Sequence, residues 1–358
     1  MSGNAKPTDL SIGVFADDQL DRVQHAYGLR SLLVLPFFAL NGSIIDLRRR
    51  TETARKALLE TERGVLFLKE LPWYCSSERF AHFQSELLAG LADEGATVVA
   101  PLATASGRRF FHDRLTGSIF LLQPYLDGRS WTGGVEEARS AGTALAALHD
   151  CGSRVTSEAF PGMRDVFASA RELVGLLPDN WSGPASARGD VASLADSALA
   201  AIDRCRREAY AAGYGRAVVP VHGDYNPFNI VFDPGSSSVT AIVDFDNACL
   251  DDRAHDLGEA LVRFAWVNYR GLSSAYGAVP SAFDLDAVKA VLNGYREYDE
   301  AAARAARPRL PAVMTAVALE LAAIGLLSSY YTADDVSALQ RNVESLLPMA
   351  NDAVAAVW

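Results

Sequence analysis

The sequence is poor in cysteine, and its cysteines are not arranged as a metal site or a disulfide framework would need. It has four cysteines in 358 residues, and no two of them stand in a CxxC spacing. Neither a zinc site nor a disulfide framework is therefore indicated. We expect the four to be small buried residues in a reducing compartment: Cys75, Cys151, Cys205 and Cys249.

The sequence also lacks an excess of positive charge and a long apolar run near its start. Its 33 basic and 44 acidic residues give a formal net charge of −11, which disfavours binding to nucleic acid or anionic membranes through bulk electrostatics. The early apolar stretch LLVLPFFAL is too short to cross a bilayer, and no basic start followed by an apolar run precedes it. We therefore expect a cytoplasmic protein without nucleic-acid or membrane partners.

What is present is the composition of a globular protein with two regions of different character. Hydrophobic residues make up 49% of the chain and charged residues 22%. Before residue 123, short apolar runs bounded by turn residues predict strands in SLLVLPFFAL, SIIDLRR, GVLFLKEL and SIFLLQPYL. A helix is predicted between the third and fourth runs, in SERFAHFQSELLAGLADEG.

After Gly128 the pattern becomes mainly helical. Helices are predicted over roughly 135–150, 187–212, 284–305, 311–329 and 334–355. The prediction is a strand-rich lobe, residues 1–123, followed by a larger helical lobe, residues 124–358.

A strand-rich island in the helical part carries a polar cluster. In VHGDYNPFNIVFD, residues 221–233, His222, Asp224 and Asn229 have the spacing HxDxxxxN, and Asp244 follows fifteen residues after Asn229 in AIVDFDNA. In a loop after a strand, this spacing can direct Asp224 and Asn229 into one cleft, and an Asp at the end of the next strand can join them. Phosphoryl transfer uses such a set: one carboxylate orients the attacking hydroxyl, while an amide oxygen and a second carboxylate hold magnesium.

The alternative for this stretch is an ordinary turn, because Asp, Asn, Gly and Pro all favour turns. Asp244 argues against the alternative. It lies between two apolar residues and is expected to be buried, so its carboxylate needs a partner, for which a metal ion is suited.

Three motifs, HGDYNPFNIVFD, AIVDFDNACLDDRAHDLG and ALAALHD, resemble the aminoglycoside phosphotransferase and choline kinase family, which includes type II homoserine kinases. The resemblance implies an α+β, two-lobed, protein-kinase-like fold with a small antiparallel-sheet N-lobe and a larger, mostly helical C-lobe. It implies that Asp224 is the catalytic aspartate, that Asn229 and Asp244 bind Mg²⁺, and that Asp246 assists. HGD and DFD replace the HRD and DFG of protein kinases, as is usual in the small-molecule branch.

The same resemblance requires a lysine at the end of an apolar strand and a glutamate on the helix that follows. GVLFLKEL supplies Lys69 and FAHFQSELLAGL supplies Glu86. Each alone could be a solvated surface residue, but the two in the required order favour a nucleotide-binding pair. No GxGxxG is present, and LNGSIID offers Ser43 as a phosphate contact, although an NG turn is common in hairpins without a ligand. ETERGVLF is a second candidate turn.

The stretch FLLQPYLDG joins the two predicted lobes. In the family that the sequence resembles, adenine hydrogen-bonds main-chain groups of this linker. Because Pro124 has no N–H, the expected donor is the N–H of Tyr125 and the expected acceptor is the carbonyl of Gln123. A plain turn between strand and helix is the alternative.

Other polar residues are expected to support the site or to contact the substrate. His222, His149 and Asp256 are predicted to make interior hydrogen bonds. The acidic residues Asp251, Asp252 and Glu259 could face a cationic substrate, and a solvated loop is the alternative.

The resemblance thus implies transfer of phosphate from ATP, with GTP not excluded, to a hydroxyl of a small molecule. Antibiotic or aminosugar-like acceptors come first, and a homoserine-type or other metabolite is the alternative. A rival of another class is a degenerate kinase fold that only binds nucleotide or a partner, against which the retained Lys69, Asp224, Asn229 and Asp244 argue. A third hypothesis is a metal-dependent hydrolase built on His222, Asp224, Asp244 and His255.

Overall fold

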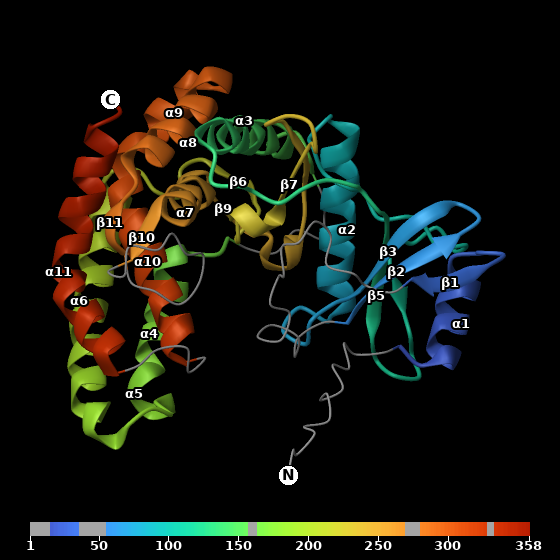
Figure 1. Ribbon diagram of the computed structural model, residues 1–358, viewed down its shortest axis with the longest axis horizontal. Helices are drawn as coiled ribbons and strands as arrows, with labels where there is room; N and C mark the ends of the chain where they lie inside the picture. Colours follow the sequence, from blue (N-terminus) through green and yellow to red (C-terminus); the bar gives the residue numbers. More distant parts are fainter. Residues whose placement is uncertain (1–14, 36–54, 157–162, 269–279, 328–332) are drawn as a thin grey trace, which may run out of the picture. The chain divides into compact units, whose positions relative to one another are not determined.

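The computed structural model describes residues 15–35, 55–156, 163–268, 280–327 and 333–358. The chain forms two compact units, one of residues 1–89 and 99–127, the other of residues 90–98 and 128–358. The first holds a small antiparallel sheet and the second is mostly helical (Figure 1), so the predicted α+β, protein-kinase-like fold class is confirmed. The second unit begins after Asp127, four residues beyond the predicted lobe boundary, and also includes residues 90–98.

The first unit is built on a five-stranded sheet of order β1-β2-β3-β5-β4. The strands are β1 (Leu32–Leu35), β2 (Lys56–Thr61), β3 (Gly64–Glu70), β4 (Phe111–His112) and β5 (Ile119–Pro124), accompanied by helices α1 (Asp17–Ala26) and α2 (Glu78–Asp93). The sequence patterns identified β1, β3, β5 and α2 but missed α1, β2 and the two-residue β4. The strand predicted in SIIDLRR lies outside the described residues.

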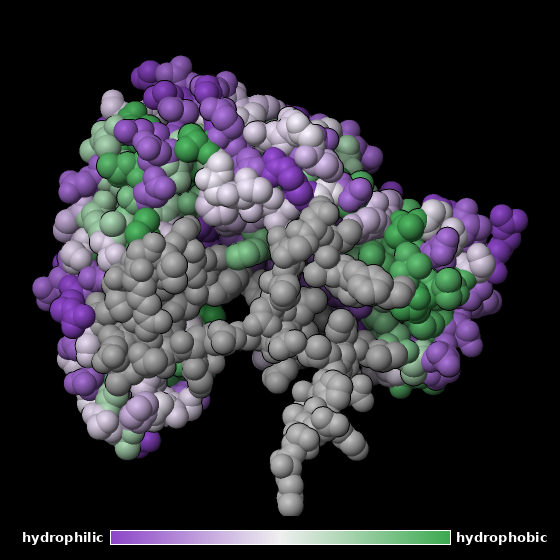
Figure 2. All heavy atoms as spheres, in the orientation of Figure 1, coloured by the Kyte–Doolittle hydropathy of each residue, from purple (hydrophilic) through white to green (hydrophobic). Residues whose placement is uncertain are grey.

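The core of the first unit lies between α1 and one face of this sheet. Strand residues Leu59, Leu66 and Phe120 are buried with Val23 of α1 and with Tyr27, which follows the helix. Some apolar side chains of the strands are exposed. Figure 2 shows hydrophobic residues gathered on the surface of the first unit. Because successive strand residues point to opposite faces, alternation leaves Val65, Phe67 and Lys69 on the face away from Leu66.

Helices make up most of the second unit. They are α3 (Val135–Gly152), α4 (Val166–Gly175), α5 (Leu177–Asn180), α6 (Arg188–Ala211), α7 (Ala254–Ala265), α8 (Leu285–Tyr298), α9 (Glu300–Ala306), α10 (Leu310–Leu327) and α11 (Ala333–Ala355). The helix predicted over 284–305 divides at Asp299, whose side chain accepts a hydrogen bond from the N–H of Ala302 and so caps α9.

Helix α10 is apolar on all sides because it lies inside the unit, in contact with α4, α6, α7 and α11. Residues Glu300–Leu327, which include α10, are the only described helical stretch long and apolar enough to cross a membrane. Most of that stretch is buried inside the protein, as in the core helix of a globular fold.

Three short antiparallel strand pairs complete the second unit. Strand β6 (Val218–Val221) pairs with β9 (Cys249–Asp252), β7 (Ile230–Phe232) with β8 (Val239–Ile242), and β10 (Trp266–Asn268) with β11 (Pro280–Phe283). The loop from β6 to β7, which we call the catalytic loop, covers residues 222–229 and contains the HxDxxxxN motif. The β6–β9 and β7–β8 pairs therefore hold the ends of this loop.

Candidate active site

The catalytic loop leaves β6 through a glycine that no other residue can replace without strain. Gly223 has a φ of 73°, in the left-handed region. A Cβ at this position would lie 2.3 Å from the carbonyl oxygen of Asn247. The loop backbone thus passes directly against the segment that follows Asp244.

His222 holds the loop through both of its ring nitrogens. Its Nε2 lies 2.9 Å from the carbonyl oxygen of Val243, and its Nδ1 accepts from the N–H of Asp224 at 3.2 Å. Only the neutral ring protonated at Nε2 satisfies both bonds. The imidazole is buried, with its ring centroid 4.5 Å from that of Phe245. These contacts leave no ring nitrogen for a metal, which argues against the hydrolase hypothesis.

The carboxylate of Asp224 is fixed by side chains of its own loop and by helix α7. Its Oδ2 accepts from Nδ2 of Asn229 at 3.0 Å. Its Oδ1 accepts from Nδ2 of Asn226 at 2.8 Å and from Nη2 of Arg263 at 3.3 Å. The side chain is 20% exposed, so an oriented carboxylate remains in reach of a bound molecule. Asn226, which stands within the motif, and Arg263 were not among the predicted site residues.

Asn229 precedes β7 and Asp244 follows β8, so the paired strands bring their backbones to the same end of the hairpin. Ile230 pairs with Ile242, and the N–H of Val243 donates to the carbonyl of Asn229 at 2.9 Å. Because the Asn229 amide nitrogen is used by Asp224, the amide oxygen is the atom left for a cation. Amide and carboxylate oxygens suit Mg²⁺.

Asp244 has an unusual backbone conformation. Its φ of 70° and ψ of 60° make it the only described residue other than glycine with a positive φ. Non-glycine residues in this region cost of order 1 kcal/mol and cluster at functional sites. Among the described residues no group of three His, Cys, Asp or Glu could hold a metal ion by itself. Asn229 and Asp244 fit a cation whose remaining ligands are nucleotide phosphates and water.

Asp256 of α7 supports the start of the loop. Its Oδ2 accepts from the N–H of His222 at 2.6 Å and its Oδ1 from the N–H of Gly223 at 2.8 Å. Oδ2 also lies 3.1 Å from Nε2 of His149, whose Nδ1 lies 2.9 Å from the hydroxyl of Tyr295. Burial raises the pKa of Asp256, but the hydrogen bond from His149 and nearby histidines outweigh it and lower the pKa to about 2.

The acidic residues Asp251 and Asp252 do not face a substrate, and that prediction is wrong. Both are fully buried. Asp251 accepts from the hydroxyl of Tyr214 at 2.7 Å and lies 2.9 Å from Nδ1 of His255. Asp252 lies 3.4 Å from the guanidinium of Arg309. Both carboxylates therefore have their partners inside the protein.

Glu259, the third residue of that prediction, is also buried and supports the catalytic loop. Its Oε2 accepts from the N–H of Tyr225 at 2.9 Å. Burial, together with the charge of Asp224, raises the pKa of Glu259 to about 8. Asp246, the second acid of the DFD motif, is buried too.

In the first unit, Lys69 is 4% exposed on β3. Glu86 lies on α2, about half exposed, with its carboxylate 3.9 Å from Nδ1 of His82 one turn earlier. The pairing of Lys69 with Glu86 stays a prediction. Ser43 lies outside the described residues, so its phosphate contact stays a prediction as well.

The predicted adenine contacts at the linker are already used by the sheet. The N–H of Tyr125 donates to the carbonyl of Val65 at 3.0 Å. Opposite residues in an antiparallel pair alternate between hydrogen-bonded and unbonded positions. Phe67 and Gln123 face each other two residues further along, so they form the next bonded pair and the Gln123 carbonyl faces β3.

The two predicted contacts are therefore shifted by one residue. Pro124 faces Leu66 at the unbonded position between those pairs, which is why a residue without an N–H fits there. The same alternation turns the carbonyl of Pro124 away from β3, and we expect this carbonyl and the N–H of Leu126, two residues later, to contact an adenine ring in place of Gln123 and Tyr125.

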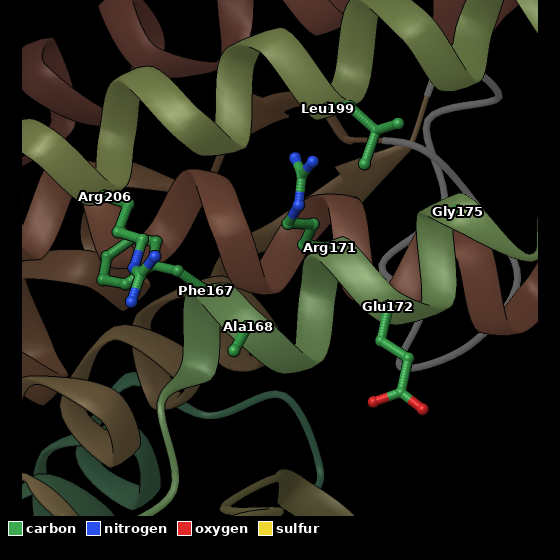
Figure 3. A pocket seen from close by; sticks show the side chains of 7 residues that line it. All are labelled: Phe167, Ala168, Arg171, Glu172, Gly175, Leu199 and Arg206. Carbon is green, nitrogen blue, oxygen red and sulfur yellow. The ribbon is translucent and has the colours of Figure 1, made fainter.

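A surface hollow of about 390 Å³ lies between α4 and α6 of the second unit (Figure 3). Its polar lining includes Arg171, which pairs with Asp203, and Arg206, which pairs with Asp165. None of the residues that line it belongs to the catalytic loop, so it contributes nothing to the candidate active site.

Comparisons with known proteins identify the family and the fold. The model of the phosphotransferase enzyme family matches residues 48–318, and the chain therefore belongs to that family. A comparison with curated proteins finds no match.

Solved structures with the same fold include three small-molecule kinases. An amicoumacin kinase in complex with AMP-PNP, Ca²⁺ and Ami is 16% identical, with a TM-score of 0.61 over 93% of this chain and 94% of the other. A microcompartment-associated aminopropanol kinase is 17% identical, with a TM-score of 0.61 over 95% and 98%. An ethanolamine kinase of Plasmodium vivax is 12% identical, with a TM-score of 0.56 over 90% and 84%.

Proposed function

We propose that this member of the phosphotransferase enzyme family moves the γ-phosphate of ATP to a hydroxyl of a small molecule. The observation that carries the proposal is the Asp224 carboxylate, fixed by Asn226 and Asn229 yet still partly exposed. This is the arrangement that a hydroxyl-orienting base needs in phosphoryl transfer.

The proposed reaction transfers one phosphoryl group from ATP to the acceptor hydroxyl. The acceptor oxygen forms a bond to the γ-phosphorus, the bond to the β–γ bridging oxygen breaks, and ADP leaves. The hydroxyl proton passes to Asp224. Asn229 and Asp244 would hold a divalent cation, which would neutralise charge on the phosphates. Lys69 on β3 is the residue that we expect to bind the phosphates.

For the acceptor, we place antibiotic or aminosugar-like compounds first and amino alcohol metabolites second. Similar solved structures include an amicoumacin kinase and a spectinomycin phosphotransferase, but also an aminopropanol kinase. At these low identities the likeness shows the fold alone, so the ranking depends on experiment. The burial of Asp251 and Asp252 removes the electrostatic argument for a cationic substrate.

The test is a screen of the purified protein for ADP release from magnesium-ATP. The panel contains aminoglycosides, nucleoside antibiotics, aminosugars, choline, homoserine and 1-amino-2-propanol, and product mass must confirm one added phosphate. We expect a hit among the antibiotics or aminosugars. Turnover of an amino alcohol or homoserine alone would reverse the ranking, and magnesium-ATP binding without any turnover would support a fold that only binds nucleotide.

Asp224→Asn tests the proposed role of the Asp224 carboxylate directly. It should lower turnover about a hundredfold or more and leave nucleotide affinity nearly unchanged. Asp233→Asn is the control, because Asp233 is an acid of the turn after β7 whose carboxylate only accepts from the N–H of Gly235. Near-normal turnover of Asp224→Asn contradicts the proposed function.

A further inference from the structure

Helix α7 carries three ionisable side chains on one face, although all of its residues are buried. Asp256, Glu259 and Arg263 follow one another at positions i, i+3 and i+7, which places them on the same side of a helix. Buried charges are costly unless they are paired. We call these three residues the α7 stripe.

The first two members of the α7 stripe hold the backbone of the catalytic loop. Asp256 and Glu259 accept from three main-chain N–H groups, those of His222, Gly223 and Tyr225. The fourth N–H of this stretch, that of Asp224, donates to His222. The loop is therefore anchored at four consecutive residues.

Arg263 differs from the other two because it contacts the reactive carboxylate itself. The guanidinium is fully buried, and Nη2 lies 3.3 Å from Oδ1 of Asp224. Each carboxylate oxygen has two lone pairs in its plane. Oδ1 accepts from Asn226 and Arg263, which fills both of them, whereas the donor at Oδ2 is Asn229.

We propose that Arg263 is a positioning residue: it holds Oδ1 of Asp224, so that Oδ2 is the oxygen that accepts the proton of the acceptor hydroxyl. The inference rests on the proposed function and adds which oxygen reacts and what orients it. Arginine suits this role because its charge is permanent and its planar fork fixes the direction of the bond.

The first experiment compares Arg263→Met with Arg309→Met. Both remove a buried guanidinium from the same unit, and Arg309 pairs with Asp252 and the carbonyl of Gly213, outside the catalytic loop. ADP release from magnesium-ATP is measured with water as the acceptor and with the compound phosphorylated in the screen. Arg263→Met should lower kcat about 10- to 100-fold, as small misplacements of reacting groups do, with the KM for ATP unchanged.

Arg309→Met should lower the unfolding temperature and keep kcat. Arg263→Lys should recover part of the lost kcat, because it restores the charge without the planar fork. Equal kcat values for Arg263→Met and wild type overturn the proposal.

The second experiment separates positioning from general damage. Arg263→Met is added to Asp224→Asn, and the effect on kcat is compared in the two backgrounds. If Arg263 acts through Asp224, the added substitution changes kcat less than twofold in the Asp224→Asn background. An equal loss in both backgrounds refutes the positioning role. Full turnover of Asp224→Asn itself would instead refute the proposed function.

Discussion

Asp256→Asn tests how strongly helix α7 holds the catalytic loop. The carboxylate of Asp256 accepts from the buried N–H of His222 and the partly buried N–H of Gly223, and it lies within hydrogen-bond distance of His149. An Asn side chain has one acceptor oxygen and one donor nitrogen. If the oxygen stays with His222 and His149, the new NH₂ group faces the N–H of Gly223, and two donors then oppose each other.

The structure sets the size of the effect. A hydrogen bond to a charged group contributes about 1.5–3 kcal/mol, and a buried donor left without a partner costs a further 1–3 kcal/mol or so. Removing the buried charge offsets part of this loss. We expect the free energy of unfolding to fall by about 3 kcal/mol, which leaves a protein of ordinary stability folded. Because Gly223 precedes Asp224, kcat should fall about tenfold as well.

Urea unfolding and ADP release measure the two effects, with Asp284→Asn as the matched control. Asp284 caps α8 through one oxygen, Oδ1, which accepts from the N–H groups of both Asp286 and Ala287. Asn caps helices as well as Asp does, so Asp284→Asn should be nearly neutral. A loss below about 1 kcal/mol for Asp256→Asn, equal to that of the control, would refute the reasoning.

Three further predictions follow from the described contacts. Gly223→Ala should lower the free energy of unfolding in urea by about 3 kcal/mol, because the backbone is left-handed and a backbone carbonyl would lie 2.3 Å from the new Cβ. The control Gly28→Ala is also left-handed but has open space around it, so it should cost only about 1 kcal/mol. Burial lowers the pKa of His255, but Asp251 outweighs burial and raises the pKa from 6.5 to about 9. About 3 kcal/mol of stability that is present below pH 6.5 should therefore disappear as the pH rises through 9. Asp251→Asn should flatten that pH dependence in thermal unfolding, and an unchanged profile would count against the pair. Leu126→Pro removes the N–H of the revised adenine contact and should weaken magnesium-ADP binding, measured by calorimetry, about tenfold relative to Leu126→Ala. Equal affinities of the two variants would exclude that contact.

The sequence was most informative where a local pattern determines the structure. Helical periodicity placed α6, α10 and α11 within a few residues of their observed bounds, because one amphipathic or apolar segment is enough to show a helix. The HxDxxxxN spacing likewise brought Asp224 and Asn229 together, since both lie in one short loop.

The errors concern features that depend on distant partners. In the sequence, Asp251 and Asp252 resemble an exposed acidic run. In the structure their carboxylates contact Tyr214, His255 and Arg309, and two of these partners, Tyr214 and Arg309, lie far away in sequence. The adenine contacts at the linker depend on which backbone groups of β5 point toward β3. That is set by the register of the two strands and cannot be read from either strand alone. Arg263 was missed because α7 itself was not predicted.

The left-handed backbone of Asp244 has a consequence for anyone who tries to make this protein more heat-resistant. Glycine adopts that conformation without the steric penalty of a Cβ, so replacing Asp244 by glycine would relieve of order 1 kcal/mol of strain. That relief is opposed by the interaction that Asp244 makes and by the greater freedom of a glycine in the unfolded chain, so the net cost of the substitution is small. A selection for survival at high temperature alone would therefore not protect the carboxylate that we assign to the cation, and a library built to improve the protein should hold this position constant.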